Sequence, residues 1–94
     1  MTPVAYSVVI PTVGRPSLGR LLDALRAASG PPPQIVLVID DRPAVSVPLD
    51  LPAWSRLEVV PGPGRGPAGA RNVGWRAAAT AWVAFLDDDV LPPA

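Results

Sequence analysis

The chain contains no cysteine, no histidine and no lysine. Without cysteine, it can form neither disulfide bonds nor a thiolate metal site. The lack of histidine excludes, within these residues, a zinc site of the usual His/Cys kind, a Ser-His-Asp triad and a histidine general base. The remaining acid–base candidates are seven Asp, one Glu and one Tyr. Any acid–base or metal chemistry of this segment must therefore rest mainly on carboxylates.

An excess of positive charge and long apolar runs are also missing. The formal net charge is zero and the pI is about 6.0, so the basic surface of a nucleic-acid-binding protein is lacking and no nucleic-acid partner is expected. No apolar run approaches the roughly 20 residues that a membrane span needs. The first residues also lack the charged and apolar regions of a signal peptide. We expect a cytoplasmic segment, which could still belong to a longer, membrane-attached chain.

Short apolar runs are what the chain does contain. They cover residues 6–10, 34–39, 57–60 and 82–86. Unbroken apolar runs, as opposed to alternating ones, are typical of strands that are buried on both faces of a parallel sheet. With 94 residues, the chain can form at most one small domain.

Helix signals separate these runs. Leucines at 18, 21, 22 and 25 form one stripe of an amphipathic helix, and Pro16 suits its first turn. A second helix is predicted from Ala70 to about Thr80, with Val73, Ala77 and Ala81 on one face. The proline-containing stretch 42–55 and the Gly/Pro-rich stretch 61–69 are predicted to be loops. The three tryptophans are interpreted as packing residues.

The order of these elements predicts the opening half of a doubly wound α/β sheet. In such sheets, ligands bind outside the carboxyl ends of the strands, where the strand order reverses. The polar residues follow the strands at these ends: Thr12 after the first, Asp40 and Asp41 after the second, and residues 87–89 after the fourth. The sequence therefore predicts a binding site at this edge of the sheet.

The triplet Asp87-Asp88-Asp89 is the strongest of these signals. Neighbouring carboxylates repel one another unless a cation or strong donors offset their charge. In an extended segment, Asp87 and Asp89 would lie on one side and Asp88 on the other. Mg²⁺ and Mn²⁺ take oxygen ligands and often bridge carboxylate to phosphate. The alternative is a solvated acidic turn, but the apolar residues that follow at 90–93 favour a metal–phosphate site.

Two further groups have both a binding and a structural interpretation. Asp40 and Asp41 could recognise a base or ribose, or they could simply begin a turn. Arg71, predicted with Asn72 to open the second helix, could contact phosphate, ribose or base. It could also pair with a neighbouring Asp, and both roles could hold together. The stretch Gly62–Gly66 matches neither known phosphate-loop pattern and is interpreted as a turn.

Taken in series, these segments resemble the N-terminal half of a family 2 glycosyltransferase with the GT-A fold. The resemblance is carried by the opening strand (SVVIPT), the first helix (RPSL followed by LLDAL), the end of the second strand (VIDD), an A-R-N-x-G segment (GARNVG) and a D-x-D motif (FLDDD) with a proline after it. Each motif is weak alone, but five motifs in the same order over nearly the whole chain are specific.

The resemblance implies a Rossmann-like GT-A fold, a UDP- or GDP-sugar donor and Mn²⁺ or Mg²⁺. Carried over to this sequence, it implies that Asp87 and Asp89 position metal and diphosphate. The residues that it implies for the nucleotide are Pro11, Thr12, Arg15, Asp40 or Asp41, Arg71 and Asp88. The sugar would pass to a hydroxyl of an acceptor, which could be a saccharide, a lipid or a small molecule.

Two features depart from the family pattern. The family usually follows its double Asp with a small pair such as Gly-Ser, whereas Arg42-Pro43 stands here. The acceptor site and the base of inverting enzymes come from later segments of the fold, so the catalytic base is expected beyond Ala94 and no residue of this chain is assigned to it. We therefore expect residues 1–94 to be a partial GT-A domain, the donor-binding half without the acceptor half, and inactive alone.

Two other functions stay open. One is a nucleotidyltransferase, which would normally need a Gly-rich, basic loop after the first strand. Only Gly14 and Arg15 are present there. The other is a non-enzymatic fragment that acts as an interaction module.

Overall fold

The computed structural model describes residues 5–42 and 47–89 and contains a four-stranded, all-parallel sheet with two helices. The elements in chain order are β1 (Tyr6–Thr12), α1 (Ser17–Ala27), β2 (Ile35–Asp40), β3 (Leu57–Pro61), α2 (Pro67–Ala77) and β4 (Trp82–Phe85). The strands lie in the order β3-β2-β1-β4, so the order reverses between β1 and β4. This confirms the predicted half of a doubly wound α/β sheet.

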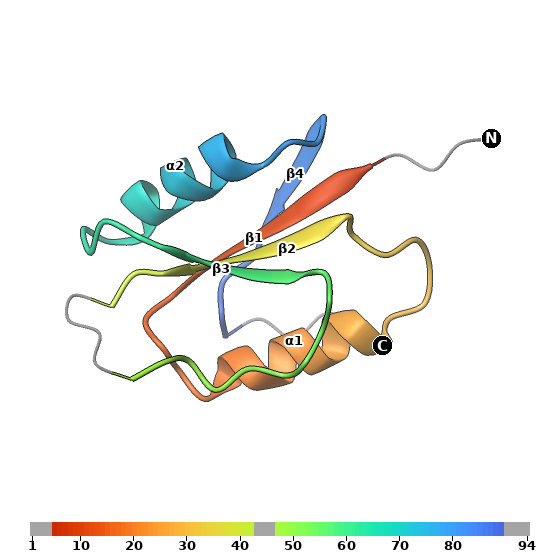
Figure 1. Cartoon of the computed structure of the whole chain (residues 1–94), viewed down its shortest axis with the longest axis horizontal. Coiled ribbons are helices and arrows are strands. Elements are labelled where there is room, and N and C mark those ends of the chain that lie inside the picture. The colour runs from red at the N-terminus through yellow and green to blue at the C-terminus, as the bar shows by residue number, and fades with distance from the viewer. Residues whose placement is uncertain (1–4, 43–46, 90–94) are drawn as a thin grey trace.

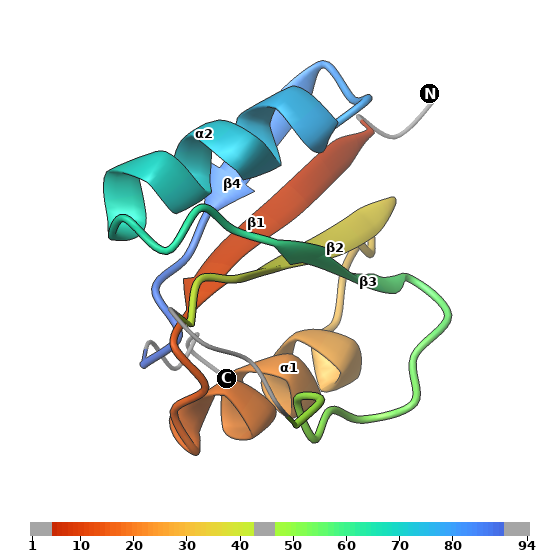
Figure 2. The same cartoon turned by 60° about the vertical axis from the view of Figure 1, so that its left-hand side comes forward.

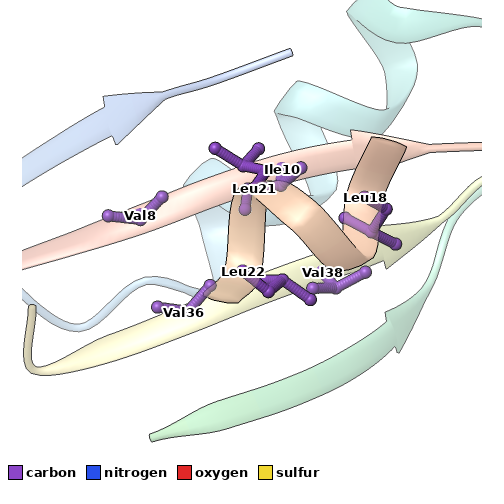
Figure 3. Packing of buried hydrophobic residues seen from close by; sticks show 7 residues of the cluster. All are labelled: Val8, Ile10, Leu18, Leu21, Leu22, Val36 and Val38. Atoms are coloured by element: carbon purple, nitrogen blue, oxygen red, sulfur yellow. The ribbon is translucent and has the colours of Figure 1, made fainter. Parts of the chain in front are cut away.

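The two helices cover opposite faces of the sheet (Figures 1 and 2). Alternate residues of β1 and β2 therefore enter two separate cores. The core on the α1 face is drawn in Figure 3 and comprises Val8, Ile10, Leu18, Leu21, Leu22, Val36 and Val38. The core on the α2 face comprises Val9, Leu37, Ile39 and Ala70. Three of the four predicted leucines are fully buried in the first core, which confirms the predicted helix stripe.

The segment between β2 and β3 is a loop in its described part, residues 47–56, as predicted. Most of its residues are exposed, but its two leucines and its tryptophan are half-buried. Leu49, Leu51 and Trp54 pack against the core on the α1 face. Their contacts fix the path of the chain between β2 and β3. Pro43 lies outside the described residues.

The first strand continues past the point where the sequence indicated that it stops. Pro11 pairs with Ile39 within β1, and the strand ends at Thr12. The peptide nitrogen of Leu86 donates a hydrogen bond to the carbonyl oxygen of Val9, so the backbone N–H and C=O groups of Val9 point toward β4. The backbone nitrogen of Pro11, two residues further on, points toward the same side. The ladder with β4 has already ended at Val9, so the missing N–H of proline interrupts no bond there.

The second helix begins three residues before the predicted start, at Pro67. A proline is well suited to the first position because its φ is already helical and its missing N–H would have had no partner. Gly66, with φ of 97°, precedes it as the N-cap. The buried face contains Ala70 and Gly74, whereas Ala77 is exposed and Ala81 lies beyond the helix. In the part of the chain that the structure describes, neither helix is long and apolar enough to cross a membrane.

The expectation that all four strands are buried on both faces is wrong for β3 and β4. Both lie at the edges of the sheet, and all of their residues are exposed or half-buried. The interpretation of the tryptophans as packing residues is wrong for Trp82 on β4 and Trp75 on α2, which are 65% and 58% exposed. Trp54, in contrast, packs against a core. The apolar runs therefore predicted correctly that these strands exist, but not how far they are buried.

Candidate functional site

A pocket of about 240 Å³ lies at the carboxyl edge of the sheet, where the strand order reverses. The pairing between β1 and β4 ends at Val9 and Phe85. The pocket lies beyond this point, between the residues that follow Val9 and those that follow Phe85. Most of the predicted site residues line it. The lining comprises Pro11, Thr12, Val13, Arg15, Asp41, Gly66, Pro67, Asp87, Asp88 and Asp89. Asp40 and Arg71 do not belong to this lining.

Thr12 and Asp88 form a buried contact in the lining of the pocket. The hydroxyl of Thr12 donates a hydrogen bond to Asp88 Oδ2 at 2.8 Å. The same hydroxyl oxygen accepts the backbone N–H of Gly14 at 2.9 Å. Only 3% of Thr12 and 6% of Asp88 are exposed. Among the three aspartates, Asp88 is thus the one that points into the protein.

The other two aspartates are exposed, and each is approached by an arginine. Asp87 pairs with Arg71 at 3.3 Å. Asp89 lies 3.6 Å from Arg15, whose guanidinium is also 3.8 Å from Asp88. Exposed ion pairs of this kind contribute little to stability, so a ligand can displace them at a small cost in free energy. Both carboxylates therefore remain available to a ligand at the rim of the pocket.

The triplet does not continue the strand as an alternating extended segment. β4 ends at Phe85, and Asp88 and Asp89 lie in a turn. Asp87 and Asp89 nevertheless both face solvent, while Asp88 is buried.

The residues after the triplet lie outside the described part of the chain. They include the apolar residues at 90–93, with the proline after the D-x-D motif, and Ala94. The expectation that the catalytic base lies beyond Ala94 therefore stays a prediction, and the described residues leave the catalytic base unassigned.

No group of three or more potential metal-ligating side chains is found in residues 5–42 and 47–89. The residues present still fit a hard divalent cation, because Mg²⁺ is commonly held by one or two carboxylates together with phosphate oxygens and water. Asp87 and Asp89 provide oxygen donors of this kind at the pocket. This fit leaves the proposed metal role of both residues as a prediction.

The side chain of Asp40 points to the α1 face of the sheet and does not line the pocket. Its neighbours along β2 show this, because Val36 and Val38 enter the core on the α1 face. Arg42 holds its carboxylate with two parallel bonds, from Nε to Oδ1 at 2.8 Å and from Nη2 to Oδ2 at 2.7 Å. These hydrogen bonds from Arg42 hold the pKa of the Asp40 carboxyl below its ordinary value of 3.8. Arg42, which departs from the family pattern, thus binds both carboxylate oxygens of Asp40, the first of the two aspartates.

The Asp40–Arg42 pair gives a testable pH dependence. A carboxyl whose pKa is lower in the folded protein than in the unfolded chain stabilises the fold above the unfolded value, and the effect fades as pH falls through the folded value. The wild-type protein should therefore be more stable than the Arg42→Gln variant near neutral pH. That difference should shrink as the pH is lowered from neutral to below the ordinary value of 3.8. Denaturation midpoints over this range measure it.

The matched control is Arg20→Gln, which removes an exposed arginine from α1. The difference between this variant and wild type should stay constant over the same pH range. A constant difference for Arg42→Gln as well would mean that the Asp40–Arg42 pair makes no net contribution to folding.

Asp41 takes a different part from Asp40, although the two are adjacent. Its Oδ1 accepts the N–H of Gly64 at 2.7 Å, and its Oδ2 accepts the N–H of Gly66 at 3.1 Å. The carboxylate is buried and lines the pocket. It therefore anchors the glycine-rich loop that leads into α2, and this loop is more than the simple turn that the sequence indicated.

Sequence reasoning also missed the contribution of Gly66, Pro67 and Val13 to the pocket. The signal for the first two was a proline directly after a Gly-x-Gly stretch, a combination typical of a helix start. Because α2 begins at Pro67, Arg71 is its fifth residue and does not open the helix. The N-terminal end of α2 instead reaches the pocket through Gly66 and Pro67.

Comparisons with known proteins show the family of the chain. The family model "Glycosyl transferase family 2" matches residues 7–94. The chain belongs to that family. In two strains of Mycobacterium tuberculosis, CDC 1551 / Oshkosh and ATCC 25618 / H37Rv, it is similar to a protein named pre-mycofactocin glycosyltransferase. Each of these relatives is 42% identical over 90 residues, which are 92% of this chain and 18% of the relative.

The chain spans about a fifth of the length of the curated relatives that it matches. No solved structure matches it significantly. The predicted family membership and the α/β fold are thus confirmed.

Proposed function

We propose that this chain is the donor-binding part of a glycosyltransferase that takes its sugar from a nucleoside-diphosphate sugar. One observation carries the proposal: in a member of family 2, four carboxylates and an arginine from three separate segments meet at one pocket, at the point where the strand order reverses. Ligands of doubly wound sheets bind at this point. The proposed site residues have different tasks, which follow from their exposure.

Asp41 and the loop that it anchors are proposed to contact the nucleoside. Asp41 uses one lone pair on each oxygen for Gly64 and Gly66, and a carboxylate oxygen can accept a second bond. The side chain lies at the pocket and can therefore accept N–H or O–H groups of a base or ribose. Asp40, in contrast, is already bonded through both oxygens to Arg42. We therefore propose Asp41 as the nucleoside contact of the pair.

The diphosphate is proposed to lie between the two exposed arginines and the two exposed aspartates. Arg15 and Arg71 each approach the acidic triplet from a different side, and a guanidinium binds phosphate as readily as carboxylate. Asp87 and Asp89 would hold Mg²⁺ or Mn²⁺ against the phosphate oxygens. Such a cation supplies neutralisation of the charge that develops on the departing nucleoside diphosphate.

The acceptor is proposed to bind outside this segment. The pocket of about 240 Å³ is smaller than the roughly 300–1,000 Å³ of common ligand sites, so we propose that it holds part of the donor only. Pre-mycofactocin, for which the Mycobacterium tuberculosis relatives are named, is the first acceptor to test. The similarity covers only 18% of those proteins, so the acceptor must be established on the full-length protein.

Substitution of the exposed aspartates tests the proposal. In the full-length protein, Asp87→Asn and Asp89→Asn should each lower the Mn²⁺-dependent affinity for UDP or GDP by about tenfold or more, because each removes a charged oxygen ligand. Isothermal titration with and without Mn²⁺ measures this effect. The control is Asp23→Asn, which changes an exposed aspartate on α1 and should leave both affinities unchanged.

Each contrary result has a definite meaning. If Asp89→Asn binds the metal–nucleotide complex as tightly as wild type, the metal role of that residue is wrong. If the wild-type protein binds CTP or GTP in clear preference to nucleoside-diphosphate sugars, the nucleotidyltransferase alternative replaces the glycosyltransferase proposal.

A further inference from the structure

The hydrogen bond between Thr12 and Asp88 joins two strands beyond the end of their ladder. The last ladder bond between β1 and β4 runs from the Leu86 nitrogen to the Val9 carbonyl oxygen. Past this bond, Pro11 has no N–H to offer, and the chains separate to form the pocket. The Thr12 hydroxyl then reaches across to Asp88 Oδ2. This contact sets where the acidic triplet lies relative to β1.

Thr12 has no hydrogen left for a ligand while this contact exists. A hydroxyl group has a single O–H to donate, and Thr12 donates it to Asp88 while its oxygen accepts the Gly14 N–H. Asp88 accepts this bond through Oδ2 and is almost fully buried. The neighbouring Asp87 and Asp89 are exposed. The buried residue and its exposed neighbours therefore differ in their tasks.

We propose that Thr12 and Asp88 are positioning residues, which hold the acidic triplet in place at the pocket through the hydrogen bond between them. Their bond holds the turn after β4 so that Asp87 and Asp89 face the pocket on either side of Asp88. This inference rests on the proposed donor-binding function and assigns to both residues a task other than nucleotide contact. Residues that hold a metal ligand in place typically matter about 10- to 100-fold for metal affinity.

A double-mutant cycle separates this inference from direct contact. In the full-length protein, Thr12→Val and Asp88→Ala should each weaken Mn²⁺–UDP or Mn²⁺–GDP binding by about tenfold. The double variant should be no weaker than the worse single variant, because both substitutions break the same bond. If both residues touched the ligand independently, the two losses would multiply. Titration calorimetry on the four proteins measures the coupling.

Two further variants make the cycle specific. Thr12→Ser keeps the hydroxyl and should restore wild-type affinity. Ser7→Ala is the matched control, because Ser7 is another buried hydroxyl of β1 and lies 2.7 Å from the hydroxyl of Thr80, just before β4. It lies at the opposite end of the strand from the pocket. Loss of that contact should lower stability without changing nucleotide affinity.

Hydrogen exchange provides a readout that needs neither metal nor turnover. In the nucleotide-free protein, the backbone amides of residues 86–89 should exchange faster in Thr12→Val than in Ser7→Ala or wild type. Unchanged exchange, or multiplying losses in the cycle, would overturn the positioning role while leaving the donor site intact. Failure of the wild-type protein to bind either nucleotide would overturn the proposed function, and this inference with it.

Discussion

Replacing Gly74 by alanine is expected to destabilise the protein, although alanine is the better helix former. Gly74 lies on the buried face of α2, directly over β1. A Cβ atom there would lie 2.3 Å from Val9 Cγ1, 3.0 Å from Cγ2 and 3.2 Å from Cβ. No rotation of the Val9 side chain relieves all three approaches, because its Cβ is fixed to the strand. The helix must therefore move away from the sheet.

The expected loss is about 2 kcal/mol, since overpacking a core costs about 1–3 kcal/mol or more and the helix propensity of alanine returns at most about 1 kcal/mol. Gly19→Ala is the matched control, because Gly19 lies within α1 and a Cβ there would meet nothing within 4 Å. It should stabilise the protein by about 0.5–1 kcal/mol. Chemical denaturation of both variants should therefore give shifts of opposite sign.

If Gly74→Ala were as stable as wild type, α2 could not pack as closely on β1 as the structure places it. The position of Arg71 would then change as well, because it lies on the same helix. The prediction also gives a physical reason for the glycine of the A-R-N-x-G segment. A side chain at that place would separate α2 from the strand that carries Pro11 and Thr12 to the pocket.

The central part of the fold follows from the sequence because its signals are local. The leucine stripe of α1 and the apolar runs of β1 and β2 each contain enough information to define an element and its buried side. The edge strands do not, because an apolar run has the same composition whether or not a neighbour covers it. Trp82 and Phe85 of β4 show this limit, since both are exposed in the described chain.

The location of the site also follows from the sequence, because parallel strands bring their carboxyl ends to one edge. The partners within the site do not follow, since they depend on distances of a few ångströms between loops. Asp40 and Asp41 are neighbours in sequence but face Arg42 and the Gly64–Gly66 loop on different sides. Only the i, i+2 spacing of Asp40 and Arg42 was a local signal. The pairing of Thr12 with Asp88, 76 residues apart, had no such signal.

Replacing Asp41 by asparagine is expected to have the largest effect among the site carboxylates on the folded structure. Asp41 accepts one glycine N–H on each oxygen. An asparagine has the same shape but a single acceptor oxygen, so its NH₂ group would face one of these donors. Loss of a hydrogen bond to a charged group at a buried position costs about 1.5–3 kcal/mol. The start of α2 should loosen with the loop.

The Asp41→Asn variant should therefore show a lower denaturation midpoint and faster exchange of the Gly64 and Gly66 amides. Asp23→Asn, on the exposed surface of α1, should stay within about 0.5 kcal/mol of wild type. A side chain at Gly62 cannot be used to stiffen the loop, because a Cβ atom there would lie 2.8 Å from Asp41 Oδ1.

Nucleotide affinity then separates the two tasks assigned to Asp41. If the residue only anchors the loop, excess nucleotide should restore the order of the loop in Asp41→Asn, because a ligand that binds the folded form stabilises it by mass action. If Asp41 also accepts a bond from the nucleoside, affinity should stay low even at temperatures where the variant is fully folded. The second outcome is the one that the proposed function requires. The first would leave the nucleoside without the contact proposed for it and would return Asp40 to consideration, with Arg42 displaced by the ligand.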